Sequence, residues 1–133
     1  MPGQSDAAPL ERRRFTGKVA LVTGGNSGIG RGVCVALARE GAKVVVAARR
    51  QAEGDGTLRL IREAGGDAIF VATDVTQASS VSAMVRTCVE HYGRLDIAFN
   101  NAGITGSVAK DIVEFRASYT VDAIRKALAA KGA

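Results

Sequence analysis

The segment 18–30 reads KVALVTGGNSGIG and joins an apolar run directly to a glycine-rich turn. The run 18–24 is bounded by Gly17 and Gly24 and is rich in Val, Leu and Ala, which is typical of a strand buried on both faces. A helical pattern begins where the glycines end. A buried strand that turns through glycines into a helix predicts one unit of a parallel sheet with crossover helices.

The same alternation continues along the chain on the C-terminal side of this segment. Apolar runs expected to be strands occupy 18–24, 42–49, 67–73 and 94–100. Helical periods occupy 28–40, 51–64 and 76–93. Because strands joined by helices form right-handed parallel units, we predict an α/β fold of about four strands. It is a Rossmann-like, doubly wound parallel sheet in the order 3-2-1-4, with helices on both faces.

The apolar stripes of the three helices predict which side chains face the sheet. These are Ile29, Val33, Ala36 and Leu37 in the first helix, Leu58, Ile61 and Ala64 in the second, and Val81, Met84, Val85, Cys88 and Val89 in the third. Thr76 is expected to cap the third helix.

The glycines of the turn have separate physical roles. Gly24 allows a sharp turn off the strand, Gly28 leaves room where a pyrophosphate would approach, and Gly30 allows close packing of the helix. Free amides at the helix N-terminus would face such an anion. The candidate ligand-binding residues of the turn are Gly24, Asn26, Ser27, Gly28, Ile29 and Gly30. A tight turn with no ligand is the alternative.

Two further motifs follow the third and fourth predicted strands. Asp74-Val75 follows the third, and Asn100-Asn101-Ala102-Gly103 follows the fourth. With TGGNSGIG, their order resembles the short-chain dehydrogenase/reductase family over residues 15 to about 115. The resemblance implies that Asp74 and the Val75 amide meet adenine, and that Asn101, Ala102 and Gly103 line the ribose and pyrophosphate. The alternatives are that Asp74 caps a helix and that NNAG forms only a turn.

The end of the second predicted strand bears on the choice of cofactor. A carboxylate there would bind the ribose hydroxyls of NAD, whereas a basic side chain would accept the extra phosphate of NADP. The residues present are Ala47, Ala48, Arg49 and Arg50. Arg49 offers a planar guanidinium suited to a phosphate, so NADP(H) is expected over NAD(H). Alternatively, the two arginines form only a solvated loop.

The catalytic pattern of the family is missing from this sequence. The resemblance implies a tyrosine with a lysine four residues later, together with a serine and an asparagine. Tyr92 is followed at that spacing by Asp96 and Tyr119 by Ala123, and no asparagine follows Asn101. We therefore expect no catalytic residues here and no fifth strand, and whether the chain is an enzyme stays open.

The two ends of the chain are expected to differ from its central part. Residues 1–14 are predicted to be a flexible tail, and 15–133 one Rossmann-type dinucleotide-binding domain. This domain is family-like to about 115 and ends in an atypical helix over 108–131, which contains Ser118, Tyr119 and Lys126.

Composition narrows the classes of partner. The net charge of +5 comes without tryptophan or a recognised DNA-binding pattern, so the basic run at 12–14 is interpreted as a solvated tail rather than a nucleic-acid contact. No apolar run has the length of a signal peptide or membrane span, which predicts a cytoplasmic protein. Cys34 and Cys88 are expected to be buried thiols and His91 a helix-end residue, with no metal site.

These observations leave three hypotheses. In the first, the chain is the NADP(H)-binding half of a short-chain oxidoreductase, a family that interconverts alcohols and carbonyls, and is inactive alone. In the second, it is a non-catalytic nucleotide-binding module that forms a homodimer through the exposed edge of the fourth strand. In the third, it is an incomplete translation product that does not fold stably.

Overall fold

The computed structural model describes residues 13–26 and 28–101. Strands and helices alternate along this part of the chain. In order they are β1 (Val19–Thr23), α1 (Gly28–Arg39), β2 (Lys43–Ala48), α2 (Gln51–Glu63), β3 (Ala68–Ala72), α3 (Ala78–Tyr92) and β4 (Ile97–Asn100). Every element predicted in this range is present. The largest difference is at β4, which begins at Ile97 rather than at residue 94.

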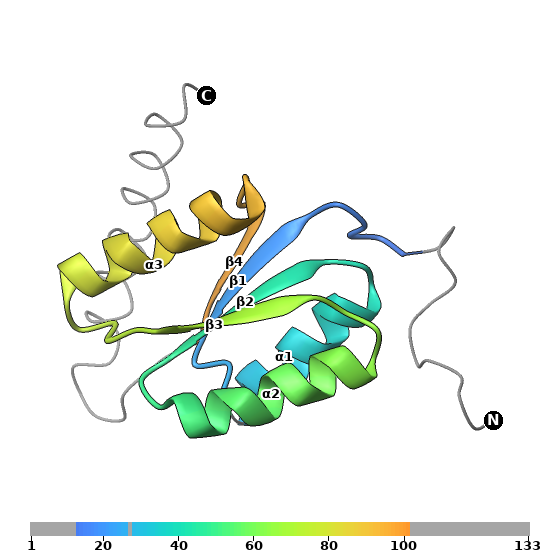
Figure 1. Cartoon of the computed structure of the whole chain (residues 1–133), viewed down its shortest axis with the longest axis horizontal. Coiled ribbons are helices and arrows are strands. Elements are labelled where there is room, and N and C mark those ends of the chain that lie inside the picture. Colours follow the sequence, from blue (N-terminus) through green and yellow to red (C-terminus); the bar gives the residue numbers. More distant parts are fainter. Residues whose placement is uncertain (1–12, 27, 102–133) are drawn as a thin grey trace.

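The strands form one parallel sheet in the order β3-β2-β1-β4, which confirms the predicted fold. Val22 of β1 lies between Val46 of β2 and Phe99 of β4 in this register. Figure 1 shows α1 and α2 on one face of the sheet and α3 on the other. The described residues therefore form three layers, with β1 and β2 in the middle of the central one.

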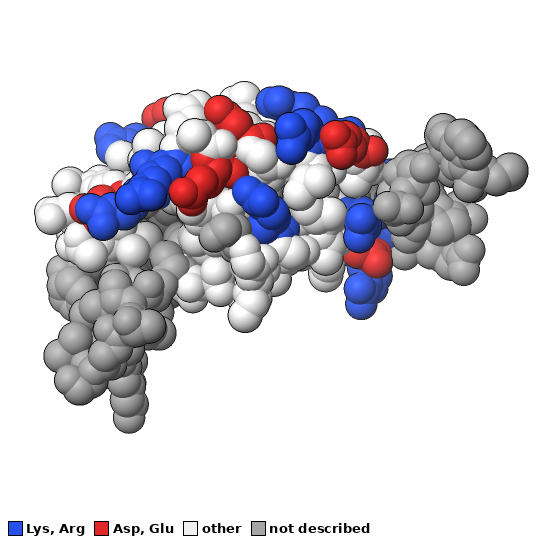
Figure 2. Space-filling model, turned by 90° about the horizontal axis from the view of Figure 1, so that it is seen from below, with Lys and Arg blue, Asp and Glu red and all other residues white. Residues whose placement is uncertain are grey.

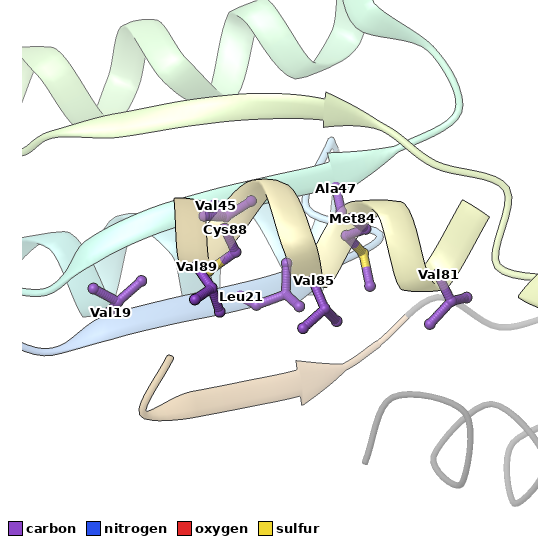
Figure 3. Close-up of a cluster of buried hydrophobic side chains, with 9 residues drawn as sticks. All are labelled: Val19, Leu21, Val45, Ala47, Val81, Met84, Val85, Cys88 and Val89. Atoms are coloured by element: carbon purple, nitrogen blue, oxygen red, sulfur yellow. The ribbon is translucent and has the colours of Figure 1, made fainter. Parts of the chain in front are cut away.

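Two hydrophobic cores lie on the two faces of the sheet. Because successive side chains of a strand point to opposite faces, Val19 and Leu21 pack under α3, whereas Val22 packs under α1 and α2. Figure 3 shows the first of these cores, in which Met84 and Val85 of α3 lie over the strands. Burial on both faces explains why β1 is apolar at every position up to Thr23.

The buried faces of α2 and α3 include every residue predicted for them. The prediction for α1 was wrong at two positions, because Ile29 is 75% exposed and Ala36 is also exposed. The buried stripe consists of Gly30, Cys34 and Ala38, spaced four residues apart. Small side chains at this spacing allow α1 to approach the sheet closely, so side-chain size rather than hydrophobicity sets the helix's rotation.

The two cysteines lie in different cores. Cys34 packs in the core under α1 and α2, and Cys88 packs in the core under α3. Burial raises the pKa of each thiol to about 12. Because the sheet separates them, each thiol acts as a small apolar group in its own core.

Several sequence predictions concern residues that the structure does not describe. They are residues 1–12 of the tail predicted over 1–14, Ser27, Ala102, Gly103 and the helix over 108–131 with Ser118, Tyr119 and Lys126. Within the described ranges, no helix combines the length and apolarity that a membrane crossing requires. The same ranges contain no group of three His, Cys, Asp or Glu side chains arranged to hold a metal ion.

Candidate functional site

The candidate site residues that are described follow the carboxyl ends of the strands. Because all four strands are parallel, these ends lie along one edge of the sheet. The turn begins directly after Thr23 of β1, Arg49 directly after β2, and Asn101 directly after β4. Asp74 follows β3 by two residues. Ligands of open α/β sheets bind at this edge, where the strand order reverses beside the first strand.

The backbone of the turn requires glycine at two positions. Gly24 has a φ of 68° and Gly28 a φ of 57°, in the left-handed region that other residues rarely adopt. The Gly24 N–H donates to the Ala47 carbonyl at 2.8 Å, which extends the β1–β2 pairing into the turn. A Cβ at Gly28 would meet no atom within 4 Å, so this glycine faces open space.

Gly30 is needed for a different reason from the one predicted. A Cβ on this residue would overlap the carbonyl oxygen of Gly24 and lie 2.7 Å from Nδ2 of Asn101. The close approach is therefore to the turn itself rather than to the sheet alone. Asn101 also donates from Nδ2 to the Gly24 carbonyl oxygen at 3.4 Å. The structure thus brings Gly24, Gly30 and Asn101 together, as expected if the turn and the NNAG motif form one site.

An arginine that the sequence analysis did not single out contacts the turn from α1. Arg31 donates from Nη2 to the carbonyl oxygens of Asn26, at 2.6 Å, and Glu53, at 2.9 Å. It also donates from Nε to Oγ1 of Thr57 at 3.0 Å. The Thr57 hydroxyl in turn donates to the Gly25 carbonyl at 2.7 Å. The only sequence signal was the position of Arg31 directly after the last glycine, because its partners depend on how α1 and α2 pack.

The side chain of Asn26 also contacts α2. Its Nδ2 donates to Oε2 of Glu53 at 2.7 Å, and Glu53 forms an ion pair with Arg50 at 3.7 Å. The Asn26 side chain therefore binds the first turn of α2. Gly25, just before it, is buried, and a Cβ there would lie 2.9 Å from Sγ of Cys34.

Arg49 and Asp74 meet at the ends of β2 and β3. Nη2 of Arg49 lies 3.8 Å from Oδ2 of Asp74, and the Arg49 side chain is 76% exposed. Oδ1 of Asp74 accepts from the backbone N–H of Thr76 at 3.0 Å and from its hydroxyl at 2.6 Å. The prediction that Thr76 caps α3 was wrong, since Gln77 occupies the N-cap position and Thr76 binds Asp74 instead. Val75, between them, is half-buried.

Tyr92 lies at the opposite edge of the sheet, near the start of β2. Its hydroxyl donates to Oδ1 of Asp67 at 3.2 Å, and Nζ of Lys43 lies 5.5 Å from its ring centroid. Burial, together with the negative charge of Asp67, raises the pKa of Tyr92 above its usual range. A tyrosine that donates a proton in catalysis needs the opposite shift, and Tyr92 lies far from the turn.

The surface over α1 and α2 carries charges of both signs. Figure 2, which views the molecule from the side where these helices lie in Figure 1, shows Lys and Arg interspersed with Asp and Glu. One pair is Arg59 and Glu63, at 4.0 Å.

A surface groove of about 540 Å³ runs between the two helices from Gly28 and Arg31 to Arg39 and Glu63. It adjoins the turn but follows the helices away from the edge of the sheet.

Comparisons with known proteins agree with this architecture. Residues 18–127 match the family of short chain dehydrogenases. The chain is 45% identical over 94 residues to the 3beta-hydroxysteroid dehydrogenase of Mediterraneibacter gnavus, covering 71% of this chain and 34% of that protein. It is 42% identical over 98 residues to the short-chain dehydrogenase/reductase homolog YusS of Bacillus subtilis, covering 73% and 90%. The chain belongs to the short chain dehydrogenase family.

Solved structures show the same relationship. A short-chain type dehydrogenase/reductase from Mycobacterium marinum has a TM-score of 0.80 and 32% identity, covering 92% of this chain and 55% of that one. An NAD⁺-bound xylitol dehydrogenase has a TM-score of 0.77 and 27% identity, covering 89% and 50%. The chain spans about a third of the Mediterraneibacter gnavus relative and about half of each structure. Its family consists of oxidoreductases that bind an NAD(P) dinucleotide.

Proposed function

We propose that this chain binds NADP(H) and supplies the cofactor-binding part of a short-chain oxidoreductase. The proposed binding residues are Gly24, Asn26, Ser27, Gly28, Ile29, Gly30, Arg49, Asp74, Val75, Asn101, Ala102 and Gly103. When bound, the cofactor would supply the hydride for interconversion of an alcohol and a carbonyl. The protein's part is to hold and orient it.

The observation that carries this proposal is the shape of the glycine turn. Gly28 opens a space at the N-terminus of α1, and the first turn of this helix contains no acidic residue. A pyrophosphate could therefore approach the helix amides without meeting a side chain or a like charge from α1. The partial positive charge of a helix N-terminus favours an anion by about 0.3–1 kcal/mol.

The position of Arg49 supports NADP(H) over NAD(H). Its guanidinium stands at the end of β2 and is largely exposed, and its ion pair with Asp74 is long. An exposed pair of this kind contributes only about 0–1 kcal/mol. A 2′-phosphate can compete for the guanidinium, because an arginine can donate two parallel hydrogen bonds to it.

Calorimetric titration of the purified chain with NADPH and with NADH, at one fixed salt concentration, tests both parts of the proposal. We expect saturable binding, tighter for NADPH. Arg49→Asp should weaken NADPH binding by roughly tenfold or more, equivalent to about 1.4 kcal/mol, and change NADH binding much less. Arg50→Asp is the matched control, because it makes the same charge change one residue away at an arginine paired with Glu53.

The outcomes separate the two parts. Binding of neither dinucleotide would overturn the proposal, and equal binding of both would overturn only the NADP(H) preference. We also propose that these 133 residues do not turn over substrate alone, because Tyr92 lies at the wrong edge of the sheet and neither tyrosine has the required lysine. Consumption of NADPH by the pure chain with any of a panel of carbonyl compounds would contradict this.

A second candidate function is self-association through β4. Among the described strands β4 pairs only with β1, and its residues Ala98, Phe99 and Asn100 are exposed. Peptide groups on the outer side of such a strand can pair with a strand of another copy. This function is compatible with cofactor binding, because the outer side of β4 faces away from β1, whereas the glycine turn follows the carboxyl end of β1.

A further inference from the structure

The guanidinium of Arg31 connects the glycine turn to α2. Its hydrogen bonds reach the glycine turn at Asn26, the first turn of α2 at Glu53, and the Thr57 hydroxyl. The planar fork of an arginine can serve such divergent acceptors at once, which a lysine ammonium on a flexible stem does less well. Arg31 therefore fixes the separation between α1, α2 and the turn.

Thr57 links Arg31 by hydrogen bonds to a second carbonyl of the turn. It is fully buried in the middle of α2, and its hydroxyl accepts from Arg31 and donates to the Gly25 carbonyl. Two successive carbonyls, those of Gly25 and Asn26, are thus held toward the α2 side. In a planar trans peptide the N–H points opposite to the carbonyl, so the Asn26 amide, which shares its peptide with the Gly25 carbonyl, is turned away from α2.

The charge of Arg31 has no acidic partner among the described residues. Its acceptors are two carbonyl oxygens and a hydroxyl, and no described carboxylate forms an ion pair with it. A half-buried cation held behind a turn raises the electrostatic potential on the turn's other side. An anion bound there would benefit from this potential as well as from the orientation of the amides.

We propose that Arg31, acting through Thr57, is a positioning residue for the pyrophosphate of the dinucleotide. It does not contact the ligand in this arrangement but holds the turn in the shape that presents its amides. The inference rests on the proposed function, because it assigns a further residue to the same site. It predicts that loss of Arg31 weakens binding of a pyrophosphate more than binding of other parts of the cofactor.

The test compares NADPH with adenosine 2′-monophosphate, which keeps the adenosine and the 2′-phosphate but lacks the pyrophosphate. Arg31→Met keeps a long apolar stem and removes the guanidinium. It should weaken NADPH binding by roughly tenfold or more and adenosine 2′-monophosphate binding by less than about twofold. Thr57→Val should act in the same direction. Arg59→Met is the control, because Arg59 is an exposed arginine that forms an ion pair with Glu63 on the same helix. The melting temperature of each variant is measured first, and all titrations are made at a temperature at which every variant is folded.

The outcomes decide between positioning and a general effect on the fold. If Arg31→Met weakens both ligands equally, or if Arg31→Lys restores full NADPH affinity, the inference is wrong. The NMR shift of the Asn26 amide, which shares its peptide with the Gly25 carbonyl, gives a readout that needs no ligand, and Arg31→Met should move it whereas Arg59→Met should not. If the unaltered chain binds no dinucleotide, the proposed function fails. The role of Arg31 in shaping the turn is then tested by the NMR shift of the Asn26 amide alone, and a shift that Arg31→Met leaves unchanged would overturn it.

Discussion

Gly30 and Gly32 lie two residues apart on α1 but face different surroundings. A Cβ at Gly30 would overlap the Gly24 carbonyl, whereas a Cβ at Gly32 would meet no atom within 4 Å. Both have ordinary helical backbone geometry, since neither is among the glycines with positive φ. Alanine at these two positions therefore distinguishes two effects on the free energy of unfolding. At Gly30 it reports the steric conflict with the turn, and at Gly32 it reports only the low helix propensity of glycine.

We predict opposite effects of alanine at these two positions. Gly30→Ala should lower the free energy of unfolding by about 1–3 kcal/mol, because the turn must shift to admit the methyl group. Gly32→Ala should raise it by about 0.5–1 kcal/mol, because alanine is the better helix former. Urea unfolding of both variants checks this. A Gly30→Ala chain as stable as Gly32→Ala would show that the turn adapts without cost.

The residues of the site could be predicted to different degrees from the sequence. The need for glycine at 24 and 28 could be predicted from the turn, because it depends on local backbone geometry. The roles of Arg31 and Thr57 could not, because the hydrogen bonds from Arg31 to Thr57 and from Thr57 to Gly25 join residues more than twenty positions apart in the sequence. Thr76 is a different case, because its partner Asp74 is only two residues away and its hydroxyl binds this side chain rather than the backbone of α3.

At the scale of elements, one carboxylate joins the start of β1 to the start of β4. Oδ2 of Asp96 accepts from the backbone N–H of Val19 at 2.9 Å and from Nε of Arg94 at 2.8 Å. Oδ1 accepts from Nη2 of Arg94 at 2.7 Å. The hydrogen bonds from Arg94 are the largest cause of a lowered pKa of Asp96, the Val19 N–H lowers it further, and burial opposes both.

This lowered pKa predicts a loss of stability in acid. Because the folded-state pKa of Asp96 lies below its unfolded value of about 3.9, the stabilisation is present above that pH. It is lost as the pH falls through the folded-state pKa. The free energy of unfolding should therefore decrease between about pH 5 and the acid limit, and Asp96→Asn should show less of this decrease. Asp55→Asn, which removes an exposed carboxylate of α2, is the control, and an equal effect of both variants would contradict the prediction.

The elements themselves could be predicted well, and the errors have a common physical cause. The patterns of α2 and α3 indicated their buried faces because large apolar side chains occupy them, as at Ile61 and Met84. In α1 the large residue Ile29 is exposed, whereas Gly30 and Cys34 face the sheet. Where packing selects small residues, a stripe of hydrophobicity gives the wrong rotation of the helix.

At the scale of the whole molecule, the two sides of the sheet are covered unequally among the described residues. α1 and α2 cover one face and α3 alone covers the other, as Figure 1 shows. The parallel order of the strands could be predicted because each connection contains a helix and has a preferred hand.

The exposed edge at β4 predicts concentration-dependent association of the chain. Ile29 and Phe99 are the large apolar residues exposed on the described surface, and only Phe99 lies on β4. Sedimentation over a wide concentration range should show the average mass rising toward that of a dimer. Phe99→Lys should reduce this rise, because a charge on an edge strand opposes pairing with a second copy. Ile29→Lys is the matched control and should associate like the unaltered chain. A monomer at all concentrations, or an equal effect of both substitutions, would show that β4 is not the contact.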